Sequence, residues 1–213
     1  MAGREAVLML HGFLMNRFVM HPLQGALREA GFDAHALDYR SIRGTLAEHL
    51  EECARAVALL SAQGASRVHL LGHSMGGVIA LSYLLREPPP AHIGRTVLLG
   101  SPVAGCDAAT RFEQQILGRL LMGNSASLWK EAMPLRIPPG REVGAIAGSE
   151  RFGLGPMVVE LDGDNDGVAR VVETRLPGMA DHILLPVSHT GMLLSAEVAR
   201  QCIAFLREGR FAR

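Results

Sequence analysis

The sequence predicts an α/β protein built on a mostly parallel sheet of about six strands. Two observations lead to this prediction. Short apolar segments bounded by Gly or Pro alternate with longer segments of helical period, which is typical of successive βα units. The chain has 213 residues, of which 48% are hydrophobic, so one domain can bury a sizeable core.

Six segments are expected to be strands, each a short apolar run, at residues 6–10, 33–37, 67–71, 96–99, 142–147 and 182–187. Five segments between or after them are expected to be helices, at residues 23–30, 46–63, 78–86, 111–122 and 191–208. The clearest helix is 46–63, whose apolar residues keep one face on the sheet. Proline has no amide donor, so Pro88-Pro89-Pro90 must end the helix before it.

The chain is expected to form a single domain over residues 1–213. Residues 101–140 contain one expected helix and end in a proline-rich exit, which is too little for a second domain. We therefore expect this segment to be a small cap or lid insertion.

Composition excludes several classes of function. Lys plus Arg and Asp plus Glu both number 21, so no net charge favours nucleic acid or anionic lipid. The three cysteines lie far apart, which fits neither a disulfide framework nor a zinc site. No apolar stretch reaches the roughly 18 residues of a membrane span, and the N-terminus lacks a signal-peptide pattern. We expect a soluble, cytoplasmic protein without stable membrane insertion; its oligomeric state is not predicted.

The most informative motif is Gly72-His73-Ser74-Met75-Gly76, a G-x-S-x-G sequence between an expected strand and an expected helix. At such a turn the serine has a strained backbone, so its neighbours two residues away must lack side chains. Ser74 is therefore the expected nucleophile. The Met75 N–H, at the start of the helix, would supply half of an oxyanion hole.

The loop after the first expected strand supplies the other half of that hole. His11-Gly12-Phe13 follows the apolar run 6–10, and a glycine there lets the backbone turn sharply. The Phe13 N–H is the second expected oxyanion donor. Leu14 and Met192 are expected to line a pocket for the acyl group of a substrate.

A serine nucleophile needs a base, and the base needs an acid that fixes its tautomer. His189 is the expected base, because it follows the last expected strand in a loop at the carboxyl edge of the sheet. His73 is expected to point away from the site across the turn. Asp166 is the expected acid because Asp-Gly-Val forms a tight turn, and Asp164 is the second candidate.

The acidic loop also permits a different interpretation. Asp162, Asp164, Asp166, Gly167 and Glu173 match the calcium-binding pattern D-x-[DN]-x-[DN]-G-x₅-E in full. The surrounding sequence does not favour two flanking helices, since Pro177 limits any helix after the loop. Calcium-dependent binding remains an alternative, and the leading hypothesis needs neither a metal nor an organic cofactor.

Together these motifs resemble the α/β-hydrolases, in particular the small lid-poor lipases and esterases of bacteria. The resemblance rests on His11-Gly12-Phe13, on residues 72–77, on Asp166-Gly167-Val168 and on residues 188–195. It implies a minimal α/β-hydrolase fold, with helices on both faces of a six-stranded sheet. It also implies Ser74 as nucleophile, His189 as base and Asp166 as acid, with Phe13 and Met75 as oxyanion donors.

The leading hypothesis is a carboxylic ester hydrolase acting on a small acyl ester or a lipid. The same triad serves thioesterases, amidases and acyltransferases, so these reactions remain alternatives. A non-catalytic binding protein on the same scaffold is the alternative from a different class.

Overall fold

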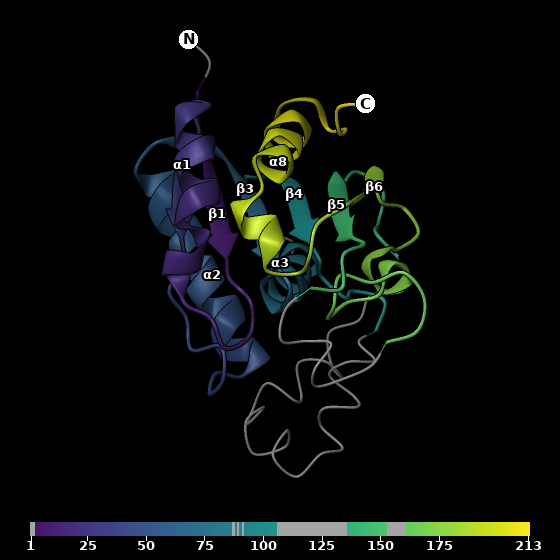
Figure 1. The fold of residues 1–213 in the computed structure, drawn as a ribbon. Helices are drawn as coiled ribbons and strands as arrows, with labels where there is room; N and C mark the ends of the chain where they lie inside the picture. Colours follow the sequence, from purple (N-terminus) through teal and green to yellow (C-terminus); the bar gives the residue numbers. More distant parts are fainter. Residues whose placement is uncertain (1–2, 87, 89, 91, 106–135, 153–160) are drawn as a thin grey trace.

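The computed structural model describes residues 3–86, 88, 90, 92–105, 136–152 and 161–213. Within these residues six parallel strands form one sheet in the order β2-β1-β3-β4-β5-β6 (Figure 1). The strands are β1 (Arg4–Leu10), β2 (Asp33–Ala36), β3 (Ala65–His73), β4 (Ile93–Leu99), β5 (Val143–Gly148) and β6 (Asp181–Leu185). The expected α/β fold is confirmed, and the described sheet is wholly parallel.

In the described part of the chain, four α-helices and three short 3₁₀ helices accompany these strands. They are η1 (Arg17–Met20), α1 (His21–Glu29), α2 (Leu46–Ala62), α3 (Met75–Leu85), η2 (Val171–Thr174), η3 (Gly191–Leu194) and α8 (Ala196–Glu208). The single helix expected over 191–208 is wrong. Ser195 adopts an extended backbone there, and its side chain accepts a hydrogen bond from the Val198 N–H to cap α8. The helix expected at 111–122, and residues 106–135 of the expected cap, lie outside the described residues.

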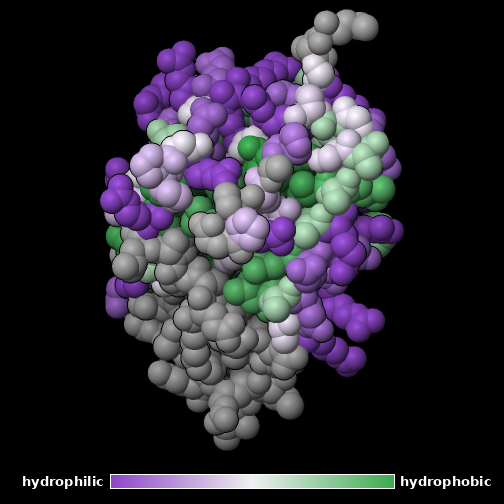
Figure 2. All heavy atoms as spheres, turned by 180° about the vertical axis from the view of Figure 1, so that it is seen from behind, coloured by the Kyte–Doolittle hydropathy of each residue, from purple (hydrophilic) through white to green (hydrophobic). Residues whose placement is uncertain are grey.

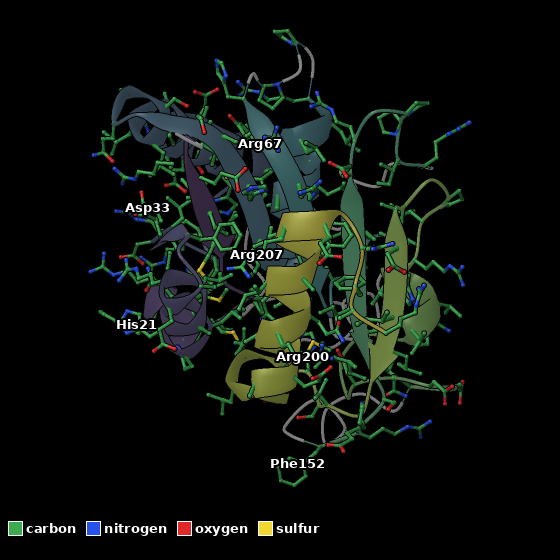
Figure 3. All side chains as sticks on the ribbon, turned by 90° about the horizontal axis from the view of Figure 1, so that it is seen from above. His21, Asp33, Arg67, Phe152, Arg200 and Arg207 are labelled. Carbon is green, nitrogen blue, oxygen red and sulfur yellow. The ribbon has the colours of Figure 1, made fainter. Side chains whose placement is uncertain are left out.

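The helices cover both faces of the sheet. Residues of α2 and α3 pack with Ala6, Leu8 and Leu10 of β1, whereas residues of α1 and α8 pack with Val7 and Met9. Alternate residues of a strand point to opposite faces, so a strand buried on both sides is continuously apolar. Figures 1 and 3 show α8 lying across one face of the sheet, with α1 beside the same face.

Helices α2 and α3 differ in how they are buried. Helix α2 has one apolar face and begins at a capping box, in which Thr45 and Glu48 each accept a hydrogen bond from the other's backbone. Helix α3 is buried on nearly all sides, consistent with its largely apolar sequence. It begins at Met75 rather than at the expected residue 78, because packing overrides the weak helix propensity of Gly76 and Gly77.

Because the strands are parallel, their carboxyl ends all lie at one edge of the sheet, toward the bottom of Figure 1. The loops after β1, β3, β4 and β6 therefore meet at that edge. Seen from behind, hydrophilic residues cover most of the opposite end of the molecule, and apolar residues form a band across the middle (Figure 2). None of the described helices is both long enough and apolar enough to span a membrane.

The packing of α8 on the sheet predicts a large effect for one aromatic side chain. Phe205 is fully buried, and its ring lies directly over Gly144 of β5. We expect Phe205→Ala to lower the free energy of unfolding by about 3–5 kcal/mol, because it leaves a cavity against the sheet. Urea denaturation followed by circular dichroism measures this change.

Phe152 provides the matched control for that measurement. Its side chain is 80% exposed and lies at the periphery of the view in Figure 3. Phe152→Ala should change the free energy of unfolding by less than about 0.5 kcal/mol. Equal losses in the two variants would contradict the packing described here.

Candidate active site

Ser74 lies at a strained turn between β3 and α3. Its φ of 54° and ψ of −124° form a combination that L-residues rarely adopt. The Ser74 N–H donates to the Leu99 carbonyl at 2.8 Å, and the Ser74 carbonyl accepts from the Gly77 N–H at 3.0 Å. The turn thus holds Ser74 at the carboxyl end of β3, near the middle of the sheet, where the residue is 7% exposed.

Three glycines make this turn possible. A Cβ on Gly72 would overlap the backbone of Gly77, and one on Gly76 would overlap the Leu10 and His11 carbonyls. These overlaps explain why the sequence pattern needs glycine at both positions. The third glycine, Gly77, belongs to the motif at residues 72–77, but no separate reason for it is apparent in the sequence; a Cβ there would collide with the Ser101 side chain.

The loop after β1 passes directly beside Ser74. A Cβ built on Gly12 would lie 3.2 Å from the Ser74 Cβ. The Gly12 carbonyl accepts hydrogen bonds from His11 Nδ1 at 2.9 Å and from the Met15 N–H at 3.3 Å. In a trans peptide the C=O and the following N–H point in opposite directions, so these two bonds turn the Phe13 N–H away from them.

Tyr39 supports this loop from the end of β2. Its hydroxyl donates to the His11 carbonyl, and its ring stacks on the His11 ring with centroids 4.1 Å apart. Burial raises the pKa of Tyr39 well above its usual value and lowers the pKa of His11, so both groups are uncharged at neutral pH. No motif in the sequence marks Tyr39, because its role depends on the pairing of β1 with β2.

Asp166 and His189 form a buried, hydrogen-bonded pair. His189 Nδ1 lies 2.8 Å from Asp166 Oδ2, and the His189 N–H donates to the Asp166 carbonyl at 2.9 Å. The other carboxylate oxygen, Oδ1, accepts from the Val168 and Ala169 amides at 2.9 and 2.7 Å. Asp166 is 1% exposed and His189 is 6% exposed, so solvent scarcely reaches the pair.

The environment of Asp166 favours its charged form. Burial alone would raise the pKa of this carboxyl group. The positive potential of His189 and the hydrogen bonds from His189, Ala169 and Val168 outweigh that effect, so the pKa lies below its usual value. The carboxylate is therefore ionised at neutral pH and able to orient the imidazole ring.

The other acidic residues of this loop lie elsewhere. Asp162 and Asp164 are exposed, and the Asp164 carbonyl accepts from the Val171 N–H. Glu173 is buried and accepts a hydrogen bond from the Arg170 backbone N–H. In the part of the chain that the structure describes, no three His, Cys, Asp or Glu side chains form a group suited to a metal ion. The geometry thus gives no support to the calcium interpretation.

Residues at the end of β4 connect the serine turn to the Asp–His pair. Ser74 is bonded to the carbonyl of Leu99, and the next residue is Gly100, with a φ of 53°. A Cβ on Gly100 would lie 2.7 Å from Asp166 Oδ2 and 3.1 Å from His189 Nδ1. The absence of a side chain at Gly100 lets the pair approach the strand end that also holds Ser74.

Contrary to the expectation that His73 points away from the site, its ring packs against His189. Its ring is fully buried, its centroid lies 4.7 Å from that of His189, and Nε2 lies 2.8 Å from the His189 carbonyl oxygen. His182 stands near the start of β6, at the other edge of the sheet, where Nε2 lies 2.9 Å from Thr174 Oγ1. Of the expected pocket residues, Leu14 is 55% exposed and Met192 is fully buried against the Asp–His pair.

Two sequence comparisons relate the chain to known proteins. Residues 7–200 match the sequence model of the "Alpha/beta hydrolase family". The chain is also 34% identical over 106 residues to "Putative carbamate hydrolase RutD" of Variovorax paradoxus (strain S110). That alignment covers 47% of this chain and 39% of the relative, so it spans well under half the length of that protein.

Solved structures share the fold. The mature lipase BlEst2 of Bacillus licheniformis is similar with a TM-score of 0.74 at 15% identity, over 99% of this chain and 94% of that one. The phospholipase PlaB of Legionella pneumophila is similar with a TM-score of 0.69 at 17% identity, over 93% of this chain and 56% of that one. At these identities the likeness concerns the fold.

The serine turn predicts that a single methyl group will disturb it. We expect Gly72→Ala to lower the free energy of unfolding by about 1–3 kcal/mol, since the new Cβ overlaps backbone atoms that cannot rotate away. Gly25→Ala is the control, because nothing lies within 4 Å of a Cβ there and alanine favours helix α1 by about 1 kcal/mol. Thermal melting of both variants measures the difference, and a neutral Gly72→Ala would contradict the close approach.

Proposed function

The chain belongs to the alpha/beta hydrolase family, and from this premise we propose that it is a serine hydrolase that cleaves carboxylic esters. The observation that carries the proposal is the convergence of Ser74, in its strained turn, with the buried Asp166–His189 pair at one sheet edge. Nucleophile, base and orienting acid are the three groups that acyl transfer requires. The proposed substrate is a small acyl ester or a lipid, and no cofactor takes part.

In the first half of the proposed reaction, the Ser74 hydroxyl attacks the acyl carbonyl. His189 takes the hydroxyl proton on Nε2 as the new C–O bond forms, and Asp166 stabilises the resulting imidazolium through Nδ1–H. The oxyanion of the tetrahedral intermediate is bound by the Phe13 and Met75 amides. Met75 is the first residue of α3, so its N–H has no acceptor within the helix. Collapse expels the alcohol, which receives the proton from His189.

In the second half, water replaces the alcohol. His189 removes a proton from a water molecule, whose oxygen attacks the acyl-enzyme carbonyl. The second tetrahedral intermediate releases the carboxylic acid, and Ser74 recovers its proton from His189. The proton balance closes over the cycle, so the reaction consumes only ester and water.

The choice of an ester over related acyl compounds rests on the comparisons. Structural neighbours include a lipase and a phospholipase, whereas the partial sequence relative is named a carbamate hydrolase. A carbamate is attacked at the same type of carbonyl by the same groups, so carbamates belong beside esters, thioesters and amides in a substrate panel. Product analysis with an added alcohol separates hydrolysis from acyl transfer.

An activated serine predicts covalent labelling at one residue. We expect a fluorophosphonate to add once to the wild-type protein and not at all to Ser74→Ala, because only an activated serine reacts quickly with it. Intact-mass analysis measures the adduct. Ester hydrolysis by Ser74→Ala should fall by several orders of magnitude. Folded wild-type protein without an adduct, or a variant with activity within tenfold of wild type, would refute the nucleophile.

The acidic loop offers a matched pair of variants. Asp166→Asn should lower kcat by about 10⁴-fold, as expected when the base loses the carboxylate that fixes its tautomer. Asp164→Asn changes an exposed residue of the same loop, and its kcat should stay within twofold. Steady-state kinetics on the best ester of the panel compares them. Equal losses in both, or a larger loss in Asp164→Asn, would reassign the acid.

A further inference from the structure

We propose that His73 is a positioning residue, whose ring N–H binds the backbone carbonyl of His189 and thereby sets where the base stands relative to Ser74. This inference rests on the proposed function, since it assigns His189 as the base. It concerns a buried polar group that the reaction scheme does not otherwise use.

The contact fixes the tautomer of His73. Nε2 lies 2.8 Å from the His189 carbonyl oxygen, and a carbonyl oxygen can only accept, so Nε2 must carry the hydrogen. In the neutral ring, Nδ1 then carries no hydrogen and can only accept a hydrogen bond. Among the described residues Nδ1 has no hydrogen-bond partner, and it would lie 3.1 Å from a Cβ on Gly12. His73 therefore makes one directed polar contact, and that contact is to the base.

The ring remains uncharged wherever the enzyme would operate. Burial, and then the neighbouring His189, lower the pKa of His73 to about 3. His11 adds to this lowering of the pKa, whereas the hydrogen bond to the His189 carbonyl and the charge of Asp166 oppose it. A neutral donor suits this place, because a cation packed against His189 would disfavour the imidazolium that forms during the reaction.

With this bond, the backbone of His189 is held on both sides of its ring. Its N–H donates to the Asp166 carbonyl at 2.9 Å, and its carbonyl accepts from His73 at 2.8 Å. His73 is joined to Ser74 by one peptide bond, and Ser74 is itself held by Leu99. The base and the nucleophile are thus tied through a single dipeptide. Misplacing a reacting group by about 1 Å costs about a hundredfold in rate.

Two substitutions of similar size separate the N–H from the bulk of the ring. His73→Gln retains an amide N–H near the position of Nε2, whereas His73→Met has a similar length and no donor. We expect His73→Met to lower kcat tenfold to a hundredfold while KM changes less than threefold, because substrate contacts are intact. His73→Gln should recover most of that loss. Should the methionine variant not fold, His73→Phe, which keeps a buried ring without an N–H, takes its place.

His69→Met controls for the loss of a buried histidine. His69 is fully buried on the same strand and accepts a hydrogen bond from the Arg95 backbone N–H at 2.9 Å. His69 lies at the middle of β3, four residues before His73. The His69→Met variant should therefore lose thermal stability to a similar extent while kcat stays within twofold. This control separates destabilisation from a displaced base.

Proton NMR of the His189 Nδ1–H supplies a readout that does not depend on turnover. Its downfield resonance should broaden or shift in His73→Met and return toward the wild-type position in His73→Gln. An unchanged resonance, a kcat within twofold of wild type in His73→Met, or equal losses in the glutamine and methionine variants would overturn the inference. Failure of the proposed function would be visible separately, as wild-type ester turnover that does not require Ser74.

Discussion

The site depends first on the backbone of Ser74, which is held in a sterically unfavourable conformation. A non-glycine residue at a φ of 54° and a ψ of −124° costs of order 1–3 kcal/mol. The cost is offset by what surrounds the turn: β3 before it and α3 after it are among the most buried elements of the chain. Because both elements are fixed by packing, the serine cannot relax without withdrawing apolar surface from the core.

A second constraint is the space that glycines leave at the sheet edge. Gly100 follows β4 and Gly148 ends β5, and a Cβ on either would press on Asp166. His189 enters from beyond β6, so Asp166 and His189 both come from loops far from Ser74 in sequence. Both residues reach the sheet edge that holds Ser74 because the parallel sheet brings every carboxyl strand end to that edge. They also need Gly100 and Gly148, which have no side chain to occupy the space.

The sequence was informative where the physical requirement is local. Strand and helix positions follow from the periods of apolar residues, and the glycines around Ser74 follow from the needs of one tight turn. The Asp-Gly-Val turn selected the aspartate that the structure places against His189. Contacts between segments far apart in the chain have no local sequence pattern that would predict them. Gly100, Gly148, Tyr39 and the His73 contact depend on which strands are neighbours. The break at Ser195 has a local cause, the cap that its side chain makes to α8, and it was missed because the apolar period continues across it.

In the described surroundings of the site, the residue bonded to the His189 ring is charged, whereas the side chains that hold the neighbouring loops are neutral. Asp166 is ionised; its Oδ1 accepts hydrogen bonds from two backbone amides, and its Oδ2 is hydrogen-bonded to the imidazole ring of His189. The groups that hold the loops are neutral: burial keeps Tyr39 protonated and holds His11 and His73 uncharged. Charged supports would have opposed the imidazolium or competed for its proton. In the proposed reaction, neutral supports leave His189 as the favoured acceptor of the Ser74 proton, and the hydrogen bonds that place His189 stay the same whether or not it carries that proton.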